Sequence, residues 1–373
     1  MADSQTLLAQ LLRSEAKSNS YKFALIRALN DLALEYPLEV TGDVAVPLRR
    51  IAQRWLVFYW GFVGERPIHQ GPRAHRGGIR QQDLSFRAAL TRLRQAWEGL
   101  PYTRPDPADG ALLLAAHQAG RGQLPPELQA LTDQTLTIIA QAVRQPVRYA
   151  GPGGEHQVFG RPSPAGTLAG QQLPGTQPNE PTFTVPGDLW RTLQRRSLWV
   201  EALCVHEWSL FTERVAQDWP VSRGEVFALL SAAPTGRTPL TWERHQVRLL
   251  MLGGQRFSCP WTGRRLAPTG FDLDHIIPVS VHPISELWNL IPSDPEHNMH
   301  VKRARLPGAE RFAAAVPALT GTYAAYAAGP ATGPVLERDI SGRFGEVLSP
   351  PLLTQRVIQF GEAVADSRNV PRY

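Results

Sequence analysis

The segment from Phe271 to Pro307 contains the residue types that metal-dependent hydrolysis of a phosphodiester requires. Such a reaction needs a general base that activates water and a divalent cation that stabilises the developing charge. His275 can act as the base, because an unperturbed imidazole has a pKa near neutrality. Asp274 and Asn298 carry the oxygen ligands that Mg²⁺, Mn²⁺ or another hard divalent cation prefers. The segment therefore predicts a hydrolytic site with one bound cation.

The spacing of these residues predicts three short elements that converge. Asp274 and His275 are neighbours, so on an extended strand their side chains point to opposite faces, and Pro278 helps to end that strand. The stretch from His275 through Asn289 to Asn298 has room for a loop, a second strand and the opening of a helix. Three elements can then present their side chains to one cation.

Basic and imidazole side chains gather on the helix expected at the end of this segment. Lys302, Arg303 and Arg305 would present positive charge to a nucleic-acid backbone. His297 and His300 are further candidates, and either could replace the last asparagine as a metal ligand, contact phosphate, or lie on a solvated helix surface. The predicted site is therefore basic where a polyanion would approach.

At these residues the chain resembles the HNH, or ββα-metal, nuclease motif. The resemblance rests on Asp274-His275-Ile276-Ile277-Pro278, Trp288-Asn289-Leu290, Asn298 with Lys302, Arg305-Leu306-Pro307 and the upstream Cys259-Pro260-Trp261-Thr262-Gly263. It implies that His275 is the general base and that Asn289 orients this histidine. It also implies that Asp274 and Asn298 bind the catalytic metal.

The sequence departs from the HNH pattern at two points. Many family members carry two Cys-x-x-Cys pairs that hold a structural zinc ion, whereas here Thr262 and His297 replace cysteines and only Cys259 remains. We therefore expect no structural zinc, and we expect the module to fold by apolar packing. Lys302 falls one position later than in the commonest form of the motif.

Apolar periodicity and composition predict a mainly α multidomain protein. The resemblance implies that it ends in a C-terminal ββα-metal (HNH) nuclease module of α+β type. Helices are expected within residues 4–35 (two), 45–63, 83–99, 109–118, 125–147, 238–252, 312–328 and 353–366. The expected domains are a helical domain over 1–149, a Pro- and Gly-rich linker over 150–181, a helical segment over 182–253, the nuclease module over 254–310 and a helical extension over 311–373. The aromatic stripe that includes Trp190, Trp199 and Trp208 is typical of a core.

Charge and targeting signals suggest the partner and the compartment. The formal net charge of +6 at pH 7 agrees with a polyanionic partner, which we expect to be DNA, while RNA is not excluded. Two cysteines fit a reducing compartment, and the N-terminal stretch lacks the basic start and apolar core of a signal peptide. The apolar stretch 55–63 is too short to cross a bilayer. We therefore expect a cytoplasmic protein without a membrane partner.

The resemblance implies a metal-dependent endonuclease that hydrolyses DNA. Residues 19–29 and 55–63 are also similar to the helical region before the HNH module in some bacterial restriction or defence-type proteins. That similarity implies antiviral defence, with residues 1–250 selecting the target, and the basic stretches 71–80 and 191–196 could follow a duplex. A homing or repair nuclease, an RNA-directed nuclease and a non-catalytic nucleic-acid-binding protein are the alternatives.

Overall fold

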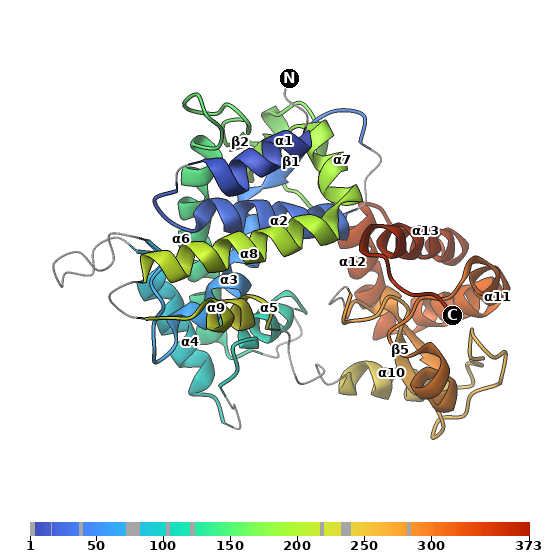
Figure 1. Cartoon of the computed structure of the whole chain (residues 1–373). Coiled ribbons are helices and arrows are strands. Elements are labelled where there is room, and N and C mark those ends of the chain that lie inside the picture. Colours follow the sequence, from blue (N-terminus) through green and yellow to red (C-terminus); the bar gives the residue numbers. More distant parts are fainter. Residues whose placement is uncertain are drawn as a thin grey trace. The chain divides into compact units, whose positions relative to one another are not determined.

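The computed structural model describes residues 4–15, 17–36, 40–71, 83–101, 105–119, 124–216, 220–232, 240–281 and 285–373. The chain forms two compact units, which comprise Met1–Ala33 with Leu38–Gly236 and Leu34–Pro37 with Arg237–Tyr373. Helices dominate both units, which confirms the mainly α fold class (Figure 1). Within the described ranges, the structure contains no helix with the length and apolar character needed to span a bilayer.

The first unit is a helical body with one small mixed sheet. Its helices are α1 (Ser4–Ala9), α2 (Tyr21–Glu35, whose last two residues belong to the second unit), α3 (Leu48–Trp60), α4 (Arg87–Glu98), α5 (Asp109–Ala119), α6 (Pro126–Arg148), α7 (Gly187–Arg195), α8 (Ser197–Val215) and α9 (Arg223–Leu230). Shorter helical turns are η1 (Gln10–Ser14), η2 (Gly61–Val63) and η4 (Ala165–Thr167). Its strands are β1 (Val44–Pro47), β2 (Ser163–Pro164), β3 (Gln171–Gln172) and β4 (Pro181–Val185).

An aromatic core holds the helices of the first unit together. The ring of Tyr59 lies 5.1 Å from Trp208 and 5.2 Å from Phe86, measured between centroids. The Tyr59 hydroxyl shares a 2.9 Å hydrogen bond with Ser20 Oγ, and Trp208 Nε1 donates to Gln70 Oε1 at 2.7 Å. These buried rings therefore keep partners for their polar atoms while they fill the core.

The aromatic stripe predicted to be core is core only in part. Trp190 and Trp208 are fully buried, but Trp199 is 70% exposed. Trp199 and Trp208 both lie on α8, where about 3.6 residues per turn carries them to opposite sides of the helix. The assignment of Trp199 to the core face was therefore wrong.

Residues 150–181, which their composition predicted to be a linker, contribute strands to the sheet of the first unit. β3 pairs in parallel with β1, β2 pairs antiparallel with β4, and the strand order is β2-β4-β1-β3. Gly170 has φ +127°, a left-handed region open mainly to glycine, and the next residue, Gln171, donates its N–H to Asp43 O at 2.8 Å. Proline and glycine exclude helix here, but two-residue strands that pair with distant segments leave no local signal. Residues 150–181 therefore belong to the first unit and do not form a linker.

The second unit combines a two-stranded hairpin with helices. Its elements are α10 (Thr241–Leu252), β5 (Asp272–His275), η5 (Leu287–Asn289), β6 (Leu290–Ser293), η6 (His297–Lys302), α11 (Ala309–Ala328), α12 (Thr332–Phe344) and α13 (Pro350–Arg368). β5 and β6 are antiparallel, with Asp272 opposite Ser293 and His275 opposite Leu290. α11 packs against α12 and α13 (Figure 1).

The segments 254–310 and 311–373, expected to be separate, share one hydrophobic core. The ring of Trp288 lies 5.5 Å from Phe344 and 5.6 Å from Phe360, and the hydroxyl of Tyr323 donates to Trp288 O at 2.7 Å. The Tyr326 hydroxyl donates to the oxygen of the first β6 residue at 3.0 Å. The C-terminal helices therefore support the hairpin rather than extend from it.

Arg343 contacts Glu35 and Tyr36, which lie in the short N-terminal segment of the second unit. Arg343 Nη1 lies 2.8 Å from Glu35 Oε1, its guanidinium also pairs with Glu286, and its centre lies 5.1 Å from the Tyr36 ring centroid. Leu34 joins the hydrophobic core of this unit. A fragment that begins near residue 236 therefore lacks part of its own core.

Candidate functional site

Asp274 and His275 form the end of β5. The Asp274 side chain is buried at 5% residue exposure, whereas His275 is half-buried. Alternation along the strand directs their side chains to opposite faces of the hairpin. The acid therefore faces the interior of the unit, and the imidazole lies nearer the solvent.

The carboxylate of Asp274 accepts hydrogen bonds on both oxygens. Lys302 Nζ lies 3.0 Å from Oδ1, and Trp261 Nε1 donates to Oδ2 at 3.2 Å. Burial raises the pKa of the Asp274 carboxyl above its usual value, while the Lys302 ammonium and the Trp261 N–H oppose the shift. A buried carboxylate needs such partners, because burying an isolated charge is costly. Sequence reasoning had not identified Trp261 as one of them.

Lys302 does not occupy the surface position expected for a phosphate contact. Its side chain is 1% exposed, and besides Asp274 its Nζ donates to the main-chain oxygen of His275 at 2.7 Å. The prediction that Lys302 faces nucleic acid was wrong, because the buried carboxylate draws the ammonium inward. Lys302 instead ties η6 to the end of β5.

Asn289 fixes the main chain directly after His275. Its Oδ1 accepts from Ile277 N at 2.9 Å, its Nδ2 donates to Ile277 O at 3.2 Å, and its main-chain oxygen accepts from Ile276 N at 2.9 Å. Asn289 is fully buried. These contacts hold the turn that follows the histidine, so Asn289 can position His275 through the backbone.

The imidazole of His275 has a neighbour that the sequence did not reveal. Its Nε2 lies 3.4 Å from Ser285 Oγ, a long hydrogen bond. Ser285 lies in the loop between β5 and η5. The half-buried ring is thus supported at one nitrogen and remains partly accessible to solvent.

The structure places Asn298 on the same short helix as Lys302, η6. Asn298 is half-buried, and its N–H donates to Asp294 O at 2.9 Å. His300 is exposed. The roles of Asn298 and His300 as metal ligands stay predictions.

His297 and Arg305 pack against the end of the described chain. The rings of His297 and Tyr373 lie 5.6 Å apart, and the guanidinium carbons of Arg305 and Arg311 lie 5.4 Å and 4.9 Å from the Tyr373 ring centroid. Burial lowers the pKa of His297, and the nearby Arg311 adds to the shift. The main chain of Leu306 pairs with the same segment, because Leu306 N donates to Pro371 O at 3.0 Å and Tyr373 N donates to Leu306 O at 3.1 Å. No local pattern in the sequence indicated this docking.

The turn that contains Cys259 is linked to η6 by charge. Arg264 Nη1 lies 3.2 Å from Asp294 Oδ2, which connects the turn to the residues just before η6. Cys259 is buried in the hydrophobic core. Among the described residues, no group of three or more His, Cys, Asp or Glu is arranged to hold a metal ion.

We expect the purified protein to contain no stoichiometric zinc. Cys259 lies among apolar side chains, and the Arg264–Asp294 pair joins its turn to the residues before η6. The turn therefore needs no tetrahedral zinc ion to keep its position. Elemental analysis after dialysis against metal-free buffer measures the zinc content, with Cys259→Ala as the matched variant. One zinc per chain whose removal unfolds the second unit would contradict the expectation.

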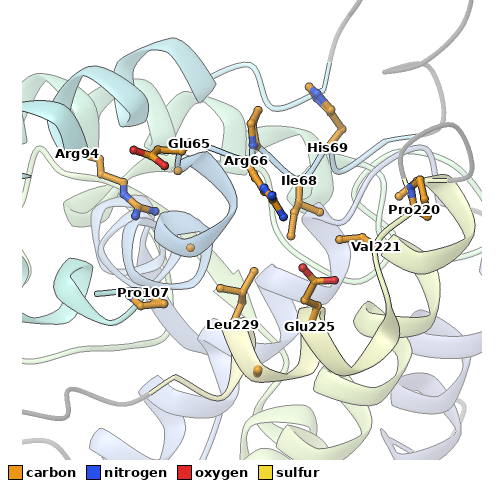
Figure 2. A pocket seen from close by; sticks show the side chains of 15 residues that line it. Glu65, Arg66, Ile68, His69, Arg94, Pro107, Pro220, Val221, Glu225 and Leu229 are labelled. Carbon is orange, nitrogen blue, oxygen red and sulfur yellow. The ribbon is translucent and has the colours of Figure 1, made fainter. Parts of the chain in front are cut away.

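The first unit contains a separate hollow of about 420 Å³, which lies between the loop after η2, α4 and α9 (Figure 2). Figure 2 shows the side chain of Arg66 and the carboxylate of Glu225 directed toward the middle of this hollow. Arg87 holds one wall in place, because it donates to Phe62 O at 2.7 Å and Ile68 O at 2.9 Å. None of the predicted site residues lines it.

Comparison with known proteins identifies the first unit. Residues 2–230 match the model of a family described as a domain of unknown function, DUF8808. The matched range covers more than half of the chain, and the protein therefore belongs to the DUF8808 family. No curated protein and no solved structure matches the chain. The match ends before α10, so Asp274, His275 and their neighbours lie outside it.

Proposed function

We propose that this protein is a metal-dependent endonuclease of the HNH type that hydrolyses phosphodiester bonds of DNA. The observation that supports the proposal most is that hydrogen bonds join three elements of the second unit at the end of β5. Asp274 and His275 end β5, Asn289 immediately precedes β6, and Lys302 ends η6, and their polar contacts join them. This is the order of elements and residues that the motif resemblance requires.

His275 acts as the general base in this proposal. The Lys302 ammonium holds its main-chain oxygen, and Asn289 holds the turn that follows. The partly accessible imidazole can then accept a proton from the attacking water without reorganisation of the backbone, which is how a preorganised site lowers the barrier.

Asp274 and Asn298 would hold the divalent cation, Mg²⁺ or Mn²⁺. When bound, the cation supplies Lewis-acid stabilisation of the charge that develops on the phosphate. Carboxylate and amide oxygens suit a hard cation, so the donor chemistry fits. Both Asp274 oxygens, however, already accept hydrogen bonds from Lys302 and Trp261. These two hydrogen bonds limit the positions from which a cation can reach the carboxylate.

Exposed arginines near the site support a polyanionic substrate. Arg265 and Arg303 are exposed on the turn and beside η6, where they can contact phosphates in any sequence. Target choice would then come from the first unit, in a restriction or defence role. Of its two basic stretches, residues 72–80 lie outside the described residues, and Arg191 is engaged with Val40 O and Asp188.

We expect purified protein to cleave plasmid DNA in Mg²⁺ and to be inactive in EDTA. Asp274→Asn removes the charged ligand while it keeps the size of the side chain, so it should require a Mg²⁺ concentration raised by an order of magnitude or more, or lose activity altogether. A gel assay across Mg²⁺ concentrations measures this. Equal activity of both proteins would mean that the nuclease is a contaminant or that Asp274 does not bind the cation.

The same assay separates the alternative substrates. DNA and RNA of matched sequence are incubated with the wild-type protein at increasing salt, because phosphate contacts weaken steeply with salt. Preferential cleavage of RNA would replace DNA as the substrate. Salt-sensitive binding of DNA without cleavage of either polymer would favour the non-catalytic alternative.

A further inference from the structure

Lys302 places a positive charge at the point where the proposed function needs a divalent cation. Its Nζ lies 3.0 Å from Asp274 Oδ1 and 2.7 Å from His275 O. The lysine is 1% exposed, so water screens this charge little. The other carboxylate oxygen accepts from Trp261 Nε1. Donors from the chain itself therefore engage both oxygens of the acid.

We propose that the Lys302 ammonium and a divalent cation are alternative occupants of the space beside Asp274. Two cations at bonding distance from one buried carboxylate repel each other strongly, because the surroundings have a low effective dielectric constant. Binding of the cation therefore requires Lys302 to release Asp274 Oδ1. This inference rests on the proposed function for the identity of the cation and on the contacts of Lys302 for the competition.

The chemistry of lysine permits such an exchange. An ammonium on a flexible four-carbon stem can move while its other partner, His275 O, stays in reach. Without the cation, Lys302 neutralises the buried carboxylate and keeps η6 attached to β5. Lys302 is thus a positioning residue that acts through the main chain of His275, and it weakens the affinity of the site for the metal.

Titration of the full-length protein with Mg²⁺ alone, followed by calorimetry, tests the proposal. Lys302→Met removes the competing charge and should bind Mg²⁺ roughly tenfold more tightly, or better, than the wild type. Asp274→Asn should give no measurable heat of Mg²⁺ binding, because it lacks the charged ligand. Arg303→Met is the matched control, because it removes one positive charge from the adjacent exposed residue and should leave the affinity nearly unchanged.

Thermal unfolding gives a second readout. Lys302→Met leaves Asp274 buried without its ammonium, so the metal-free variant should unfold at a lower temperature than the wild type. Saturating Mg²⁺ should raise its unfolding temperature more than that of the wild type, because a ligand stabilises the state that binds it. If the metal-free variant is unfolded, Mg²⁺ should restore its helical circular dichroism, and should not do so in Asp274→Asn/Lys302→Met.

Equal Mg²⁺ affinities of wild type and Lys302→Met, absence of binding to both, or an unfolded variant that Mg²⁺ does not restore would each overturn the proposal. Its failure is distinct from failure of the nuclease function. If the wild type cleaves DNA but binds Mg²⁺ as tightly as Lys302→Met does, only the competition between Lys302 and the cation is disproved. If Lys302→Met binds Mg²⁺ more tightly but the wild type cleaves no nucleic acid, the competition stands and the nuclease function is disproved.

Discussion

Replacing His275 by alanine is expected to lower the rate of DNA cleavage by about 10²–10⁴-fold, the usual cost of losing a general base. The hydrogen bonds that hold the backbone here come from Lys302 to His275 O and from Asn289 to Ile277, and alanine keeps both. The fold and the affinity for DNA should therefore change little. Single-turnover cleavage of a defined duplex gives the rate, and a binding assay in EDTA gives the affinity.

His245→Ala provides the matched control for this prediction. His245 is an exposed histidine of α10 in the same unit, and no role in the site is assigned to it. Its replacement should leave the cleavage rate within the error of the assay. If His275→Ala cleaves as fast as His245→Ala, the histidine is not the base, and the proposed function loses its central residue.

Replacing Arg343 by methionine is expected to destabilise the second unit by about 3–5 kcal/mol, the range for breaking a buried ion pair from one side. Arg343 is buried and pairs with both Glu35 and Glu286. Methionine fills much of the space but removes the guanidinium that pairs with both carboxylates. Urea unfolding followed by tryptophan fluorescence measures the loss as a shift of the transition midpoint.

Arg338→Met is the comparison for this second prediction, because Arg338 lies on the same helix, α12, and its side chain is 46% exposed. Its partner Asp339 is buried, but water screens the exposed guanidinium, so this pair should contribute less than the pairs of Arg343. Adding Glu35→Gln to Arg343→Met should recover part of the lost stability, since one buried charge is then removed. Midpoints of Arg343→Met and Arg338→Met that coincide would show that the pairs of Arg343 with Glu35 and Glu286 do not stabilise this unit.

Local sequence patterns were sufficient for most helices. The expected helices at 109–118, 125–147 and 238–252 correspond to α5, α6 and α10 within a few residues, because apolar periodicity is a property of the helix itself. The same local reasoning missed α12 and α9 and mistook 150–181 for a linker. A two-residue strand such as β3 is defined by its partner β1, which lies far away in the chain.

The sequence by itself determined the mainly helical class and the place in the chain where Asp274, His275 and Asn289 follow one another around a hairpin. Strand alternation and the turn at Pro278 are local, and for this reason they could be read from neighbouring residues. Only the tertiary structure decided that Lys302 turns inward to Asp274 rather than outward to solvent. A lysine on a helix can point to solvent or to the interior, and its local sequence does not decide which. Lys302 turns inward because folding buries the Asp274 carboxylate, which then needs a positively charged partner.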